Sequence, residues 1–248
     1  MSLRQVIIVG GHGKVALRLA KLLANTGKHS VTSTIRTEDH IPDLKAASPA
    51  IHPLLLSLED APVSEFKKAF TGKDVVVFSA GAGGKGGPER TMKVDYEGAL
   101  KVFDAIEAVE TNKPSLVLVS AIDVRGVNVI PSHYNDEDIE ISKKMRGVLG
   151  KYMEAKYLAD KNLSERTAFK WSILRPGGLS DEAGTGKASI GRTHLTPSIS
   201  RDDVAQALSV LVDRPDAAGL AVDMVGGDTP IADGLDAFIA KGETDFLG

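Results

Sequence analysis

The chain has 248 residues, 42% of them hydrophobic and 25 of them glycine, which is enough apolar surface for one large core. Its 30 basic and 33 acidic side chains leave a formal charge of −3 at pH 7, so neither nucleic acid nor an anionic membrane is expected as a partner. Cysteine is absent, which excludes disulfides, iron–sulfur clusters and a cysteine nucleophile. The N-terminal apolar run is too short for a signal peptide, and no run approaches the ~20 residues of a membrane span, so we expect a cytoplasmic protein.

Short apolar runs alternate along the chain with longer segments of helical spacing. The apolar runs are rich in leucine and β-branched residues, as in strands buried on both faces, and span 6–9, 31–35, 51–56, 75–78, 116–119, 171–174 and 221–225. This order predicts an α/β fold of the Rossmann type: a doubly wound, mainly parallel sheet of about seven strands with helices on both faces. We expect residues 1–248 to form a single domain, whose smaller substrate-side portion comes mainly from 177–200 and 226–248.

Helices are predicted between these strands. The first follows the first strand and ends at a left-handed stop around Gly27. Two more span about 92–110 and 150–166. The last begins at Ser200, whose hydroxyl can cap the backbone amide of Asp203.

A glycine loop joins the first strand to the first helix. Gly10, Gly13 and Ala16 have the spacing of a dinucleotide-binding turn, in which Gly13 lets the backbone approach a pyrophosphate at the helix N-terminus. A plain strand–helix turn is the alternative, and the ending of a P-loop is absent. We predict that a dinucleotide contacts five residues of the loop: Gly10, His12, Gly13, Lys14 and Val15.

The second strand ends without the acidic residue that usually accepts from the ribose 2′-hydroxyl of NAD. Arg36 stands there instead, and its guanidinium either pairs with a 2′-phosphate, helped by His12 and Lys14, or is a solvated strand-end charge. This pattern favours NADP(H) as the cofactor. After the fourth strand, three small residues allow a cofactor ribose to lie against the backbone: Ala80, Gly81 and Ala82.

Tyr152 and Lys156 form a YxxxK motif. Residues i and i+4 of a helix share a face, so Lys156 can lie beneath both Tyr152 and a cofactor ribose. Because a neighbouring ammonium favours the phenolate, we expect the pKa of Tyr152 to fall from its usual value of about 10 toward neutrality. Tyr152 can then act as general acid or base on a carbonyl or alcohol, while the nicotinamide carries the hydride.

Seven segments occur in an order that is more specific than any one of them: VGGHGKVA at 9–16, DVVVFSAG at 74–81, VDYEG at 94–98, LVLVSA at 116–121, YMEAK at 152–156, ILRPGGL at 173–179 and ISRDDVA at 199–205. The ordered set resembles the short-chain dehydrogenase/reductase superfamily, in its atypical NAD(P)H-binding branch of epimerase/dehydratase-like proteins. The resemblance covers nearly the whole chain, and it implies the Rossmann fold and NADP binding.

The resemblance also implies a catalytic set around Tyr152 and Lys156. The asparagine of the family corresponds to Asp95, an acid that also typifies this branch; a helix cap or a water ligand is the alternative role. The catalytic serine of the family is usually the second residue of a Ser-Ser pair, and the corresponding pair here is Ser120-Ala121. Ser120 therefore either supplies the catalytic hydroxyl or bonds to backbone. By position, the resemblance places five residues near the cofactor: Ser57 and Leu58 at the adenine, and Pro176, Gly177 and Leu179 around the nicotinamide carboxamide.

The acidic stretch 133–140 lacks calcium-loop spacing and is interpreted as a solvated loop rather than as the rim of a substrate pocket. The six histidines have no paired-ligand spacing, so we predict no metal.

The leading hypothesis is an NADP-dependent oxidoreductase that moves a hydride between the nicotinamide and a small-molecule carbonyl or alcohol. An epimerase or dehydratase that uses the same hydride step is one alternative. A non-catalytic regulator that senses NADP(H) and exposes a nonpolar patch near the cofactor is the other. The sequence predicts neither the substrate nor the oligomeric state.

Overall fold

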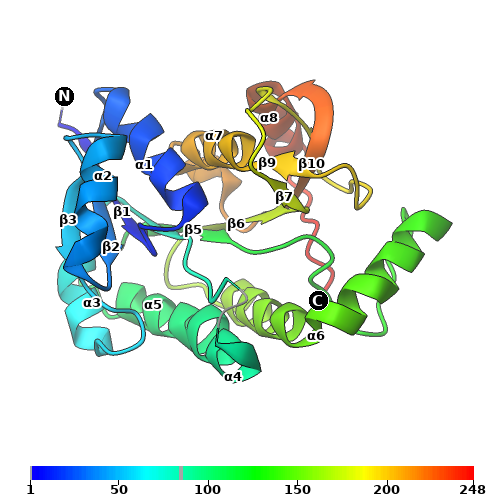
Figure 1. The fold of residues 1–248 in the computed structure, drawn as a ribbon, viewed down its shortest axis with the longest axis horizontal. Coiled ribbons are helices and arrows are strands. Elements are labelled where there is room, and N and C mark those ends of the chain that lie inside the picture. Colours follow the sequence, from blue (N-terminus) through cyan, green and yellow to red (C-terminus); the bar gives the residue numbers. More distant parts are fainter. Residues whose placement is uncertain (1, 84–85) are drawn as a thin grey trace.

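The structure is a computed structural model that describes residues 2–83 and 86–248 (Figure 1). Its main strands are β1 (Arg4–Val9), β2 (His29–Ile35), β3 (His52–Leu55), β4 (Val75–Phe78), β5 (Ser115–Val119), β6 (Trp171–Pro176), β8 (Lys187–Ile190) and β10 (Ala221–Pro230). Within the described residues they form one eight-stranded sheet in the order β3-β2-β1-β4-β5-β6-β10-β8. Neighbours in this sheet run parallel, except that β8 is antiparallel to β10. A separate pair joins β7 (Leu179–Ser180) to β9 (Ile199–Ser200).

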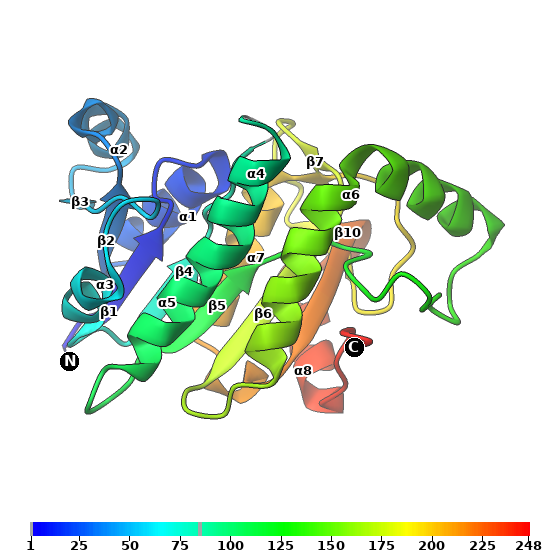
Figure 2. The same ribbon diagram turned by 90° about the horizontal axis from the view of Figure 1, so that it is seen from below.

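Helices cover both faces of the sheet (Figure 2). One face carries α1 (Lys14–Asn25), α2 (Ile41–Ala47), α7 (Arg201–Val212) and α8 (Ile231–Lys241). The other carries α3 (Val63–Phe70), α5 (Gly98–Glu107) and α6 (Asp136–Ser164). Shorter turns complete the chain: η1 (Glu38–His40), α4 (Gly87–Thr91), the π-helical turn η2 (Met92–Glu97) and η3 (Pro215–Ala217).

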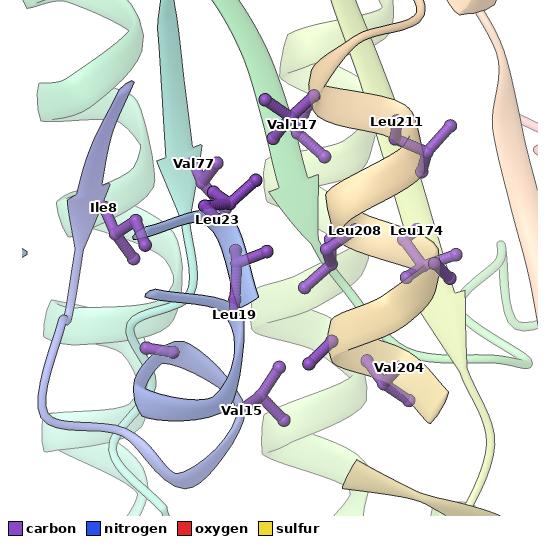
Figure 3. Packing of buried hydrophobic residues seen from close by; sticks show 14 of the residues in the cluster. Ile8, Val15, Leu19, Leu23, Val77, Val117, Leu174, Val204, Leu208 and Leu211 are labelled. Atoms are coloured by element: carbon purple, nitrogen blue, oxygen red, sulfur yellow. The ribbon is translucent and has the colours of Figure 1, made fainter. Parts of the chain in front are cut away.

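The core lies on both sides of the sheet because its central strands are apolar on both faces. In β1, Val6 and Ile8 belong to the cluster under α1 and α7, whereas Ile7 and Val9 belong to the cluster under α3 and α5. All four side chains are fully buried. Figure 3 shows the first cluster filling the space between the sheet and the two helices. Burial of each such side chain stabilises the fold by about 1.5–3 kcal/mol. The sheet therefore holds the loops at its edge in place.

The strand order reverses between β1 and β4, which neighbour each other although β2 and β3 intervene in the sequence. The carboxyl ends of the parallel strands meet at one edge, and the loops that follow β1 and β4 therefore lie together there. This is the position at which doubly wound sheets bind their ligands.

The predicted fold class is confirmed, and the seven predicted strands are all present. The eighth strand, β8, escaped prediction because its sequence KASI is short and mostly polar. The predicted end of the first helix at Gly27 and the predicted cap by Ser200 are both confirmed. Gly27 has φ +68° just after α1, and the hydroxyl of Ser200 accepts from the amide of Asp203 at 3.0 Å.

The expectation of a solvated loop over 133–140 is wrong, because α6 begins at Asp136. The side chain of Asn135 accepts from the amide of Asp138, and the side chain of Asp138 accepts in return from the amide of Asn135. This reciprocal cap starts the helix well before the predicted residue 150. The helix is kinked at Leu149, where φ is −111° and ψ is 20°, and its first half extends past the edge of the sheet (Figure 2). No helix in the described part of the chain is long and apolar enough to cross a membrane.

Candidate active site

The glycine loop passes closely against the loop after β4. Gly10 has φ +81°, and a Cβ built there would lie 2.6 Å from the Cα of Ala80. Both the backbone conformation and the available space therefore require glycine. The amide of Gly11 donates to the carbonyl of Thr34 at 2.9 Å, which ties the loop to the end of β2.

The first turn of α1 is open to an anion. Gly13 is its N-cap, no side chain caps the helix, and its first turn holds no acidic residue. Val15 turns its side chain into the core, so only its backbone faces the loop. Free amides together with the positive end of the helix dipole fit a phosphate group. The residues present thus fit a dinucleotide pyrophosphate.

Arg36 follows β2 at the same edge of the sheet. Its side chain is mainly exposed and lies 3.8 Å from the carboxylate of Glu59. Glu59 is held more closely by Arg90, at 2.7 Å, and this hydrogen bond lowers the pKa of Glu59. Arg36 is therefore the more loosely held of the two arginines around Glu59 and is available to an incoming anion.

The other two predicted phosphate ligands already have acidic partners. Nε2 of His12 lies 2.7 Å from Asp43, and Nζ of Lys14 lies 2.6 Å from Asp181. Asp181 is also 3.0 Å from Arg201 at the start of α7. His12 and Lys14 thus lie beside the glycine loop as predicted. A phosphate bound there would compete with Asp43 for His12 and with Asp181 for Lys14.

Ser57 and Leu58, which the resemblance places near the adenine, follow β3 at the same edge of the sheet. Ser57 donates its hydroxyl hydrogen to Asp60 at 2.6 Å. Leu58 packs against α5, since a Cβ at Gly98 would lie 2.8 Å from its Cδ2 atom. The carbonyl of Leu58 accepts from Lys101 at 2.7 Å. The site therefore has a preformed wall at this end.

Asp95 joins the loop after β4 to helix α6. One of its carboxylate oxygens accepts from the amide of Ala82 at 2.9 Å, and the other lies 3.2 Å from Nζ of Lys156. A Cβ at Gly81 would approach the same carboxylate to 3.0 Å. Lys156 also donates to the carbonyl of Val119 at 3.2 Å. Asp95 is thus the counterion of a buried ammonium rather than a helix cap.

Tyr152 lies one helical turn before Lys156, whose Nζ is 5.8 Å from the centre of the phenol ring. Burial raises the pKa of Tyr152, and the carboxylates of Asp95 and Asp160 add to the effect against the opposite influence of Lys156. The expected fall in the pKa of Tyr152 is therefore wrong for the protein by itself. Burial is the largest of these effects and outweighs the charge of Lys156.

Ser120 is buried at the end of β5 and donates to the carboxylate of Asp160 at 2.8 Å. Burial raises the pKa of Asp160 to about 6, although Arg175, Ser120 and Lys156 all favour its charged form. The hydroxyl thus bonds to a side chain rather than to backbone. Asp160 was not predicted, but the sequence carries a signal for it, because it continues the i+4 spacing of Tyr152 and Lys156 by one more turn.

The segment after β6 borders the other side of the site. The carbonyl of Pro176 accepts from Ile122, and the amide of Gly177 donates to Met224 at 2.8 Å. Gly177 is closely packed, since a Cβ there would lie 2.8 Å from Val225. Leu179 is 40% exposed and thus able to contact a ligand.

Most of the predicted site residues fall into two groups at one edge of the sheet. The glycine loop packs against Ala80 before α1, and Arg36 follows the neighbouring strand β2. The second group, Tyr152, Lys156, Asp95 and Ser120, converges between β5, η2 and α6. Within residues 2–83 and 86–248, no group of three or more histidine, aspartate and glutamate side chains is placed to hold a metal ion.

This arrangement is that of the Rossmann-type NAD(P)-binding proteins. A sequence profile described as NAD(P)H-binding matches residues 10–215, and the chain belongs to that family. It is 38% identical to a UPF0659 protein of Schizosaccharomyces pombe over 97% of both chains. It is 32% identical to an uncharacterized sugar epimerase, YhfK, of Bacillus subtilis, over 93% of this chain and 98% of the other. Among solved structures it is similar to the oxidoreductase ylbE of Lactococcus lactis, with a TM-score of 0.79 and 25% identity over 95% of this chain and 97% of that one. The resemblance inferred from the sequence is confirmed.

Proposed function

We propose that this chain is an NADP-dependent oxidoreductase that acts on a small carbonyl or alcohol substrate. The observation that carries the proposal is the buried Lys156 ammonium, which lies beside Tyr152 and is tied through Asp95 to the loop after β4. A buried ammonium is costly unless it is paired. The Lys156 ammonium lies between the phenol of Tyr152 and the loop after β4, and this position suits a proton-transfer site.

In this proposal each residue has a distinct task. When bound, the nicotinamide supplies or accepts the hydride at the substrate carbon. Tyr152 gives its phenolic proton to the carbonyl oxygen in reduction and takes it back in oxidation. Lys156 holds the cofactor ribose and favours the phenolate that reduction leaves behind. Asp95 positions Lys156.

Ser120 polarises the substrate oxygen only when its hydrogen is free. While Asp160 is charged, it accepts that hydrogen at 2.8 Å. Once Asp160 is protonated, it can donate to Ser120, and the hydroxyl hydrogen can turn toward a substrate oxygen. Because the pKa of Asp160 is about 6, this exchange falls within an accessible pH range.

Cofactor choice rests on Arg36, which stands where an NAD site usually has an acid. We further propose that 177–200 and 226–248 form the substrate side, since β8 and α8 lie in these segments. The stretch after β6 is short, which favours a small substrate over a nucleotide sugar.

The test is calorimetric titration of the full chain with NADPH, NADP+, NADH and NAD+. The proposal predicts binding of the phosphorylated pair with at least about 10-fold preference, equal to about 1.4 kcal/mol. A screen of small aldehydes and ketones, followed by the loss of NADPH absorbance, then tests turnover. Absence of binding by all four nucleotides would overturn the proposal.

A non-catalytic NADP(H) sensor is the second candidate, because apolar side chains are exposed close to Tyr152. Val148 is 78% exposed and Leu149 is 45% exposed, both just before Tyr152 at the kink of α6. Such a patch suits a partner protein. An epimerase reaction, suggested by the name of the Bacillus subtilis relative, is the enzymatic alternative. Tight NADPH binding without turnover of any carbonyl or sugar substrate would favour the sensor.

A further inference from the structure

The glycine loop and the turn after β2 bring two histidines face to face. The ring centres of His12 and His40 are 3.7 Å apart, and the rings are inclined by only 6°. His12 comes from the glycine loop and His40 ends η1, directly after the strand that Arg36 follows. The stack therefore stands at the edge where the adenosine ribose of a dinucleotide lies in this fold.

Charged groups of both signs face this pair. Asp43 of α2 holds Nε2 of His12 at 2.7 Å, while Nδ1 of His40 is buried and has no hydrogen-bond partner among the described residues. Burial lowers the pKa of His40, helped by His12 and Arg36, whereas Asp39 and Asp43 act in the opposite direction. Nδ1 of His40 is thus not committed to any hydrogen bond among the described residues, and its surroundings disfavour the charged form of the ring.

We propose that His12 and His40 form a proton-accepting pair that recognises the 2′-phosphate of NADP(H) together with Arg36 and makes cofactor preference depend on pH. This rests on the proposed function, since it requires a dinucleotide at the glycine loop. Two stacked imidazolium rings repel each other, and His12 is one of the groups that lower the pKa of His40. A phosphate monoester carries about −1.5 to −2 charge at pH 7 and removes that obstacle.

The consequence follows from linkage between proton and ligand binding. A phosphate that raises the proton affinity of the pair must itself bind more tightly when the pair is protonated. NADP(H) affinity therefore rises as pH falls toward the normal range of histidine, about 6.5. NAD(H) carries a hydroxyl at this position and lacks the effect.

The experiment is calorimetry of the full chain with NADP+ and NAD+ at pH values of about 6.5 and 8, in two buffers of different ionisation enthalpy. The buffer difference reports the protons taken up on binding. We expect NADP+ affinity to rise by at least about threefold at the lower pH, with NAD+ affinity changing less than about twofold. His12→Asn and His40→Gln are each expected to reduce the proton uptake and the pH dependence of NADP+ binding. His52→Gln removes an exposed histidine at the start of β3, the end of the strand away from the site, and is the matched control. This variant keeps both the proton uptake and the pH dependence of NADP+ binding.

Three other outcomes would contradict this inference or the proposed function. If the wild-type protein prefers NADP+ over NAD+ equally at both pH values, this inference is overturned but the proposed function stays intact. This comparison requires no variant. Equal loss of NAD+ and NADP+ binding in folded His12→Asn or His40→Gln assigns the pair to the loop or the adenine and also overturns it. Failure of the wild-type protein to bind either nucleotide overturns the proposed function itself.

Discussion

The carboxylate of Asp95 lies 3.2 Å from the ammonium of Lys156, and both side chains are almost completely buried. Because Asp95 also accepts from the amide of Ala82, this one ion pair connects η2, α6 and the loop after β4. The position of Lys156 is thus set by a residue far from it in the sequence. The catalytic geometry that we propose and the stability of the fold therefore depend on the same contact.

Replacing Asp95 by Asn is therefore expected to destabilise the protein by about 3 kcal/mol, because it removes the nearest counterion of the buried ammonium. Urea unfolding measures the change. Asp202→Asn is the matched control, since it removes a 2.7 Å pair with Arg18 that is partly exposed, and should cost less than about 1 kcal/mol. Equal losses for the two variants would contradict the importance of the buried pair.

Arg36→Glu is expected to weaken NADP+ binding by at least about 10-fold and NAD+ binding by less than about twofold, because it places a negative charge beside the 2′-phosphate. Calorimetric dissociation constants for the two nucleotides provide the comparison. Arg192→Glu reverses an exposed charge that is paired with Glu243 and serves as the control. If Arg36→Glu reduced both affinities equally, Arg36 would have no part in phosphate recognition.

Tyr152→Phe is expected to abolish turnover of any substrate found in the carbonyl screen, since the phenol supplies the proton. NADPH affinity should stay within about twofold of wild type, because the hydroxyl is assigned to the substrate and not to cofactor binding. Steady-state rates and calorimetry on the same preparation separate the two effects. Unchanged turnover would remove Tyr152 from the proton-transfer role.

Asp160 is expected to make the protein more stable as the pH falls. Its pKa in the folded protein is about 6, above the 3.8 of an unperturbed aspartate, so the folded state binds the extra proton between these values. Lowering the pH from about 7.5 to 5.5 should therefore add about 1 kcal/mol to the free energy of unfolding from this group. Asp160→Asn should remove that increment in urea unfolding at the two pH values. An identical pH dependence in wild type and variant would show that Asp160 does not titrate there.

Several local features could be predicted because they depend on neighbours in the sequence. Ser200 caps α7 through an amide three residues away, and Gly27 ends α1 with a backbone conformation that other residues resist. The glycine spacing located the turn before α1 in the same way. Such features need no knowledge of distant segments.

Other features could not be predicted, and the reasons differ. The start of α6 was missed because Gly147 and Gly150 flank its kink and lower helix propensity, while the cap formed by Asn135 and Asp138 uses an Asp in place of the more usual Glu or Gln. The pKa of Tyr152 was assigned the wrong direction because spacing reports its neighbour Lys156 but not burial or Asp95. The stack of His12 on His40 joins loops that follow different strands.

The sequence by itself determined the strand–helix order, the Rossmann class, the glycine turn and the shared helix face of Tyr152 and Lys156, because each follows from local periodicity or spacing. Tertiary structure alone decided which charges meet. Asp95 neutralises Lys156, Asp160 takes the hydrogen of Ser120, and Asp43 holds His12. These pairings arise where strand ends and helices converge at one edge of the sheet, and electrostatic energy depends on distance and burial that spacing along the chain does not encode.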